Sequence, residues 1–288
     1  MNVLLLGAGG QVGRALLRQV PTSVAVTALG RAELDITDEA RVQQAVEGHH
    51  PRWILNAAAF TAVDAAEGAP EAAHAVNATA VSHLARAAER AGARLLHFST
   101  DFVFDGASSL PLAPDARTGP LSVYGASKLA GEQRARAENP ESIVLRTSWV
   151  HAADGRNFVR AMLGLMATRP RVSVVCDQIG SPTWSTGVAR TAWRLVEIDA
   201  PAGIHHWCDA GVASWYDFAV AIQEEALPRG LLVRPVPVLP IRTAEYPTSA
   251  RRPAFSVLDA TGTRALTGLP ATHWRTHLRR MLDELAAL

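Results

Sequence analysis

Cysteine is scarce in this 288-residue sequence, neither sign of charge is in excess, and long apolar runs are absent. Two cysteines, Cys176 and Cys208, are too few for a disulfide framework, which favours reduced thiols and a cytoplasmic protein. With 28 basic and 27 acidic side chains, the net charge of +1 excludes nucleic-acid or membrane-surface binding through bulk charge. No apolar run reaches about 18 residues, so we expect no membrane span. The start, Met1–Leu6, enters a strand directly and lacks the features of a signal peptide.

The first half of the sequence alternates short aliphatic runs with longer segments of helical character. Apolar residues make up 48% of the chain, which is enough for a large core. Strands separated by helices are typical of βαβ units, which build a parallel sheet covered on both faces. The sequence therefore predicts an α/β protein with a Rossmann-type, doubly wound parallel sheet. The expected strands are residues 3–6, 24–29, 53–55, 94–98 and 143–145, and the expected helices include 38–47 and 71–91.

The second half is less regular and predicts a smaller C-terminal α/β substrate lobe. We expect a nucleotide-binding domain at residues 1–150, to which 177–203 also contribute, and a discontinuous lobe within 151–288. The helix expected near 186–198 could still pack on the first sheet, so this boundary is soft. Further expected elements of this half are helices at 157–168, 215–226 and 274–285 and strands at 172–176 and 204–207.

A glycine-rich loop directly follows the first expected strand. Gly7, Gly10 and Gly13 have the spacing G-x-x-G-x-x-G and precede a helical segment. Glycine there permits a tight turn, close approach of a pyrophosphate, and close packing of helix on strand. The free N–H groups at the start of the helix then suit phosphate oxygens. This context predicts a dinucleotide site.

The end of the second strand indicates which dinucleotide binds. A carboxylate at this point would bind the adenine ribose, but the strand ends in Leu29-Gly30-Arg31. Arg31 could pair with a 2′-phosphate, which favours NADPH, with NADH as the alternative. Asp35 is a candidate for the adenine edge.

Three further residues form a candidate catalytic set. Tyr124 and Lys128 are four residues apart and share a helix face. A phenol has a pKa near about 10, and a nearby ammonium is expected to lower it. Thr100 stands where the fourth expected strand ends, and ligands of open α/β sheets bind outside the carboxyl ends of strands. Thr100 is therefore placed to donate a hydrogen bond to a substrate oxygen while Tyr124 exchanges a proton with it.

In order and spacing, these motifs resemble the extended short-chain dehydrogenase/reductases that act on nucleotide sugars, and among them the dTDP-4-dehydrorhamnose reductase family. The resemblance spans essentially the whole chain. The segments that carry it are 1–5, 10–13, 56–64 with Glu67, 99–104, 124–125, 128–132, 146–150, 157–158, 177–178, Gly180, 182–183, 246–248 and 252–253.

The resemblance implies NADPH-dependent reduction of the C4 ketone of dTDP-4-dehydro-β-L-rhamnose to dTDP-β-L-rhamnose. In that reaction Tyr124 would donate the proton, Lys128 would hold the nicotinamide ribose and tune Tyr124, and Thr100 would orient the carbonyl oxygen. The expected cofactor-binding residues are Gly7, Gly10, Gln11, Val12, Arg31, Asp35, Ile36, Ala57, Ala58 and Ala59, together with Tyr124 and Lys128. The expected sugar-nucleotide contacts are Thr100, Asp101, Trp149, Asn157 and Arg252.

Where this sequence departs from the family pattern, the properties of the family are not assigned to it. Some relatives have a glutamate linked to a metal-bridged dimer where this chain has Ala15, so no metal is expected. His205, His206 and Cys208 match no zinc spacing. The oligomer is left as a monomer or a homodimer.

Two other functions remain open at this stage. A nucleotide-sugar 4-ketoreductase of the 6-deoxytalose type would share every motif that performs chemistry. A non-catalytic NADP-binding regulatory subunit would be expected to lose the catalytic set, which is present here. A dehydratase is disfavoured because Phe102 stands where that group has glutamate.

Overall fold

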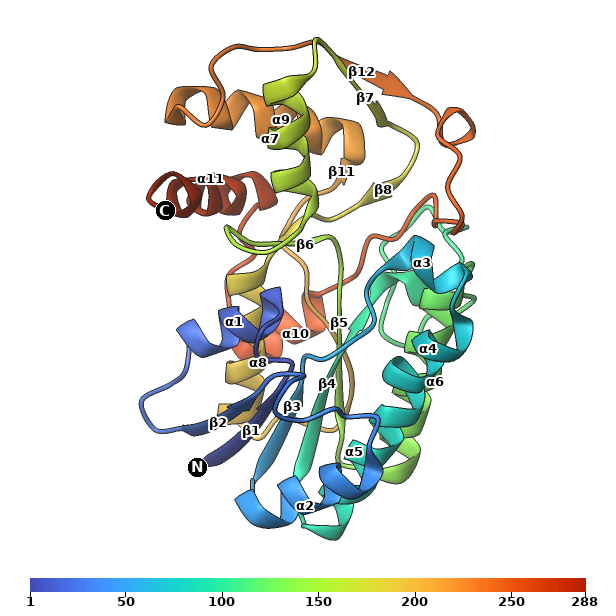
Figure 1. The fold of residues 1–288 in the computed structure, drawn as a ribbon, viewed down its shortest axis with the longest axis vertical. Helices are drawn as coiled ribbons and strands as arrows, with labels where there is room; N and C mark the ends of the chain where they lie inside the picture. The colour runs from blue at the N-terminus through green and yellow to red at the C-terminus, as the bar shows by residue number, and fades with distance from the viewer.

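The core of the molecule is a six-stranded parallel sheet with the strand order β10-β5-β4-β3-β1-β2. The computed structural model describes residues 1–288. The predicted Rossmann-type fold is confirmed, and all five strands expected in the first half belong to this sheet (Figure 1). The strands are β1 (Asn2–Leu6), β2 (Ala25–Leu29), β3 (Trp53–Asn56), β4 (Arg94–Thr100), β5 (Ile143–Thr147) and β10 (Gly203–His206).

Helices cover both faces of the sheet because its central strands carry apolar side chains on both sides. One face packs on Val42, Leu84 and Ala88, whose helices lie side by side. The other face packs on Leu16, Val188 and Trp193. Burial on both sides explains the nearly continuous apolar runs of these strands. The helices of the first face are α2 (Glu39–His49), α5 (Ala80–Arg90) and α6 (Val123–Glu138), and those of the second are α1 (Gln11–Arg18) and α8 (Ser185–Glu197).

The single helix expected at residues 71–91 is wrong in one respect, because a π-helical turn interrupts it. Helix α4 (Pro70–His74) leads into this turn, Ala75–Thr79, before α5 begins. Within the turn, the buried Asn77 side chain binds both the N–H and the carbonyl of Phe60 and also Ser127 Oγ. The turn thus ties the loop after β3 to α6, a long-range contact that helical periodicity does not reveal.

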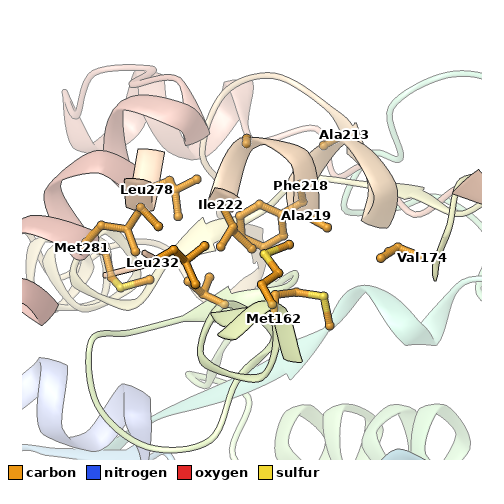
Figure 2. Close-up of a cluster of buried hydrophobic side chains, with 14 of the residues drawn as sticks. Met162, Val174, Ala213, Phe218, Ala219, Ile222, Leu232, Leu278 and Met281 are labelled. Carbon is orange, nitrogen blue, oxygen red and sulfur yellow. The ribbon is translucent and has the colours of Figure 1, made fainter. Parts of the chain in front are cut away.

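The second half forms a smaller lobe beyond the carboxyl ends of the sheet strands (Figure 1). Its apolar core joins three helices, with Phe218, Ile222 and Leu278 fully buried (Figure 2). The helices are α7 (Phe158–Thr168), α9 (Trp215–Ala226) and α11 (Trp274–Ala286), and the main strand pair is β7 (Val172–Val175) with β12 (Val238–Ile241). The short elements are α3 (Val63–Glu67), α10 (Thr261–Thr267), β6 (Val150–His151) paired with β9 (Thr183–Trp184), and β8 (Ile179–Gly180) paired with β11 (Ala213–Ser214).

The chain returns from the lobe to the main sheet before it ends. Helix α8 packs on α1, and β10 adds a sixth strand beside β5. Residues from both halves of the sequence therefore build the main sheet. The division into residues 1–150 with 177–203 and a lobe within 151–288 stays a prediction. None of the helices combines the length and apolar character needed to cross a membrane.

Candidate active site

A cleft of about 330 Å³ opens at the carboxyl ends of β1, β2 and β3. Eight of the expected cofactor-binding residues line it, although they come from three separate loops. They are Gly7, Gly10, Arg31, Asp35, Ile36, Ala57, Ala58 and Ala59, and the cleft is completed by Gly9, Gly30, Leu34, Phe60 and Val76.

The backbone of the glycine loop packs too closely at Gly7 and Gly13 to leave room for a side chain. Gly7 has φ of +76°, and a Cβ there would lie 2.5 Å from the backbone nitrogen of Ala58. A Cβ on Gly13 would collide with the carbonyl of Gly7. The loop therefore lies against both the end of β3 and the start of α1, whose first-turn N–H groups have no partner within the helix. Free N–H groups beside small side chains are a setting that suits a pyrophosphate.

Gln11 and Val12 do not line this cleft. The Gln11 side chain points to the smaller lobe, where it donates to the Arg156 carbonyl and accepts from Asn157 Nδ2 at 2.9 Å. Val12 packs on the core beneath the sheet. Only the backbone of these two residues remains for phosphate contacts, so their cofactor-binding role stays a prediction.

The loop after β2 contains a carboxylate that the sequence analysis did not consider. Glu33 Oε2 accepts a hydrogen bond of 2.8 Å from the N–H of Gly30. Arg31 is exposed beside it. Asp35 accepts from the backbone and the hydroxyl of Thr37, and these bonds lower the pKa of its carboxyl. The end of the cleft formed by the loop after β2 thus carries one free guanidinium and two anchored carboxylates.

Thr100 and Tyr124 lie next to each other at the same edge of the sheet. Thr100 is the last residue of β4, and Tyr124 lies in the first turn of α6. That helix begins where it does because Ser122 caps it and Glu67 accepts from the N–H of Val123 at 2.8 Å. Phe102 packs edge-on against the Tyr124 ring at 5.8 Å between centroids.

The expectation that Lys128 lowers the pKa of Tyr124 is not met in this structure. Burial raises the pKa of Tyr124 to about 12, only partly offset by the Thr100 side chain, and the charge of Asp101 adds to the increase. Lys128 is turned away from the phenol: its Nζ donates to the Phe98 carbonyl at 2.7 Å and lies 3.1 Å from His97 Nε2. Tyr124 is thus a protonated phenol, which is the form that donates a proton.

Asp101 is buried, although it was expected to contact the sugar. Its carboxylate accepts from Ser256 Oγ at 2.5 Å and from Thr100 Oγ1 at 3.1 Å. Burial raises the pKa of Asp101 to about 6, while both hydroxyl bonds lower it. Asp101 therefore joins Thr100 to the C-terminal segment, and its contact with the sugar stays a prediction.

A larger cavity of about 910 Å³ lies in the smaller lobe. Arg252 contributes to it and is held by Asp64 Oδ2 at 2.6 Å. Asn157 does not line it; its side chain caps α7 and binds Gln11. The other lining residues are Phe158, Ala161, Met162, Leu165, Arg169, Pro170, Arg171, Val172, Ser173, Val174, Val175, Gln178, Trp215, Tyr246 and Thr248.

Trp149 approaches this cavity through a stacked pair of indoles. Its ring lies parallel to that of Trp215, with 3.5 Å between centroids and 3° between planes. A Cβ on Gly180 would meet the Trp149 indole at 2.5 Å, so the ring is enclosed from both sides. Trp149 itself has φ of +46°, a conformation that non-glycine residues rarely adopt.

Sequence reasoning missed several residues of the site. Trp215 was assigned no role, yet it lines the larger cavity and stacks on Trp149. His97 was missed although a signal existed: it is a lone titratable residue within an otherwise apolar strand segment. Gln178 and Tyr246 belong to quoted motifs but were assigned no role.

Comparisons with known proteins agree with this geometry. The family model described as the RmlD substrate binding domain matches residues 1–287. A dTDP-4-dehydrorhamnose reductase of Aggregatibacter actinomycetemcomitans is 41% identical, covering 97% of this chain and 98% of that protein. A solved dTDP-4-dehydrorhamnose reductase from Clostridium acetobutylicum has a TM-score of 0.93 at 36% identity, covering 99% of both chains. Another, from Bacillus anthracis in complex with NADP, has a TM-score of 0.92 at 33% identity, covering 98% and 99%. The chain therefore belongs to the RmlD family, the family of the dTDP-4-dehydrorhamnose reductases.

Proposed function

We propose that this chain reduces the C4 ketone of dTDP-4-dehydro-β-L-rhamnose with NADPH and releases dTDP-β-L-rhamnose. The observation that carries the proposal is the placement of Thr100 beside a protonated Tyr124 at the sheet edge that also lines the cofactor cleft. Family membership supplies the substrate, since similar reductases carry this name. A hydroxyl donor and a proton donor at one point suit reduction of a carbonyl.

In the proposed mechanism the residues of this chain position the ketone and supply the proton. When bound, NADPH supplies the hydride to C4. Thr100 orients the carbonyl oxygen, and Tyr124 gives its hydroxyl proton to the oxygen as charge develops there. Gly7, Gly10 and Arg31 would hold the pyrophosphate and the 2′-phosphate of the cofactor.

The larger cavity supports a sugar nucleotide as the second ligand. Three arginines, Arg169, Arg171 and Arg252, line it together with the aromatic rings of Trp215 and Tyr246. Guanidinium groups suit a diphosphate because they can bind its oxygens in bidentate fashion, and aromatic faces suit a base. We assign Arg252 and Trp149 to the substrate on this basis.

The direct test mixes the purified chain with NADPH and enzymatically prepared dTDP-4-dehydro-L-rhamnose, with the product identified by NMR. We expect loss of nicotinamide absorbance and formation of dTDP-L-rhamnose. The C4 epimer as product would move the enzyme to the 6-deoxytalose type. NADPH binding without oxidation would contradict the proposed reaction and favour a regulatory subunit.

The Tyr124→Phe variant tests the proton donor. Removing only the hydroxyl is expected to lower kcat by at least about 100-fold, because general acid catalysis contributes about that much or more. NADPH affinity, measured by nicotinamide fluorescence, should stay within about twofold. Turnover at the parental rate would show that another group supplies the proton.

The proposal also covers where the protein works and what it binds. The protein is proposed to work in the cytoplasm, in keeping with two cysteines that form no disulfide. Its partners are proposed to be the small-molecule nucleotide sugar and, as a monomer or homodimer, at most a second copy of itself. Neither a membrane nor a nucleic acid is included.

A further inference from the structure

Behind the catalytic helix, three buried side chains form a continuous path from β3 through β4 to α6. Asn56 Nδ2 lies 3.1 Å from His97 Nδ1, and His97 Nε2 lies 3.1 Å from Lys128 Nζ. Each of the three residues is at most 2% exposed. Lys128 is the only lysine in the chain, since every other side chain counted as Lys or Arg is arginine. Unlike a guanidinium, a lysine amine can lose its proton in a protein.

The hydrogen bonds at one end of this path fix the orientation of the Asn56 amide. The backbone N–H of Ala58 can only donate, and it lies 3.1 Å from Asn56 Oδ1. The amide nitrogen of Asn56 must therefore face His97 and donate to its Nδ1. A neutral imidazole that accepts at Nδ1 carries its single proton on Nε2.

That proton points at Lys128. An ammonium has no lone pair and cannot accept it, whereas an uncharged amine can. The uncharged amine accepts from His97, donates one N–H to the Phe98 carbonyl at 2.7 Å, and keeps a second N–H free. With an ammonium, the Lys128 N–H and the His97 Nε2–H would both be donors and could not bind each other. The alternative is that the Asn56 amide flips, which would leave the Ala58 N–H facing an amide nitrogen. Either arrangement loses a buried hydrogen bond.

We infer that Asn56 and His97 are positioning residues that favour the uncharged amine of Lys128, so that in the cofactor-free chain this lysine gives up its proton more readily than an ordinary lysine does. The consequence reaches Tyr124, because Lys128 no longer favours the phenolate once it has lost its proton. Tyr124 then keeps its own proton, which is the form that reduction needs. The inference deepens the proposed function, on which the reductive role of Tyr124 rests.

The charges around Lys128 are consistent with this assignment. Glu132, one turn along α6, favours the ammonium, but its carboxylate is already bound by Arg146 at 2.9 and 2.7 Å and by Ser99 Oγ. Burial outweighs Glu132 and lowers the pKa of Lys128 to about 8. Burial holds the pKa of His97 well below its usual range, so the ring is neutral. Asp101 is the other buried acid nearby, and its charge acts on Tyr124.

A single lysine makes the ionisation directly measurable. In protein labelled with ¹³C-lysine, the Cε signal comes from Lys128 alone, and its shift follows the charge of the amine. Titrated without cofactor, it should have its midpoint near pH 8. A midpoint near the ordinary value of about 10.4 would overturn the inference.

The tautomer of His97 can be read in the parental chain, and a variant is needed only to assign the signals. Long-range ¹H–¹⁵N spectra distinguish a protonated ring nitrogen from an unprotonated one, and the His97→Gln variant assigns the signals. We expect the proton on Nε2 and none on Nδ1 at pH 9. A proton on Nδ1 would place an ammonium opposite Nε2 and contradict the argument.

The Asn56→Asp variant is expected to reverse the direction of the hydrogen bonds that run from residue 56 through His97 to Lys128. A carboxylate can accept from both the Ala58 N–H and a His97 Nδ1–H, which leaves the Nε2 lone pair facing Lys128. The Lys128 midpoint should rise by at least about one pH unit. Asn139→Asp is the matched control, because Asn139 is a buried asparagine at the end of the same helix, where it binds the Ala93 carbonyl. Equal midpoints in Asn56→Asp and the parent would overturn the inference.

None of these measurements uses NADPH or a sugar. Failure of the inference therefore leaves the proposed reaction standing. Failure of the chain to reduce the sugar would leave the protonation states of Lys128 and His97 unchanged. If Asn56→Asp does not fold, the titration and the tautomer of the parent chain still decide.

Discussion

We expect cofactor choice to depend on a few residues at the end of β2. Arg31 is the one free cation in the cofactor cleft, and Glu33 is anchored beside it on the N–H of Gly30. A 2′-phosphate at this end would gain a guanidinium and meet a carboxylate. Both side chains are exposed, so each acts on affinity and not on folding.

The Arg31→Ala and Glu33→Gln variants should therefore move NADPH affinity in opposite directions. Loss of Arg31 is expected to weaken NADPH by roughly tenfold, the size of one charge-assisted hydrogen bond, and to leave NADH within about twofold. Glu33→Gln should strengthen NADPH because a like charge is removed. Fluorescence titration of both cofactors checks this. Equal losses of NADPH and NADH in Arg31→Ala would remove the argument for NADPH preference.

Asp101 gives the chain a pH-dependent stability. Its pKa in the folded chain is raised to about 6, so the folded state holds this proton more tightly than the unfolded state does. The stabilisation is present below about pH 4 and is lost as pH rises through about 6. The expected loss between pH 4 and 7 is roughly 3 kcal/mol.

Asp101→Asn should remove this dependence. The amide can still bind Ser256 and Thr100, but it does not ionise. Denaturant unfolding of both proteins from pH 4 to 7 should show the parent losing stability relative to the variant. A constant difference across this range would show that Asp101 is already ionised at pH 4.

Among the elements, the strands of the first half were predictable because strands buried on both faces need continuous apolar residues. The start of α2 was predictable within one residue, because the helix expected from residue 38 begins at Glu39, directly after its cap Asp38. Two other features could not be predicted: the π-helical turn at Asn77 and the return of β10 to the main sheet. Both depend on contacts with residues far away in the sequence. Likewise, the position of the cofactor cleft could be predicted because a local glycine motif marks it. The burial of Asp101 could not be predicted, because it involves Ser256, which no local sequence pattern links to Asp101.

The contact between α6 and β5 depends on one buried ion pair. Glu132 and Arg146 are each 2% exposed and bind in bidentate fashion. Glu132→Gln leaves Arg146 buried without its counter-charge, which should destabilise the chain by about 3–5 kcal/mol. Glu197→Gln, in the exposed Arg194–Glu197 pair, is the control and should change stability by less than about 1 kcal/mol. Similar losses in guanidinium unfolding of both variants would contradict a special role for the buried pair.

At the scale of the whole molecule, one polar junction joins the glycine loop to the smaller lobe. Gln11 follows Gly10 and binds Asn157, the residue that caps α7. Helix α7 itself lines the larger cavity. Asp154 adds ion pairs of 2.9 Å with both Arg14 and Arg18 of α1. A ligand that orders the glycine loop therefore acts on the helix that forms the second cavity. Through this junction, we expect NADPH and the sugar nucleotide to strengthen each other's binding.

The Asn157→Ser variant separates the two roles of Asn157. Serine can still cap α7 but is too short to reach Gln11, so stability should change by less than about 1 kcal/mol. The dissociation constant of dTDP, measured calorimetrically with and without NADPH, should then depend less on NADPH than in the parent. Linkage requires that the same factor be lost from NADPH affinity when dTDP is varied, which checks the measurement internally. An unchanged factor would place the coupling in the Asp154 ion pairs, and Asp154→Asn would then be the variant that removes it.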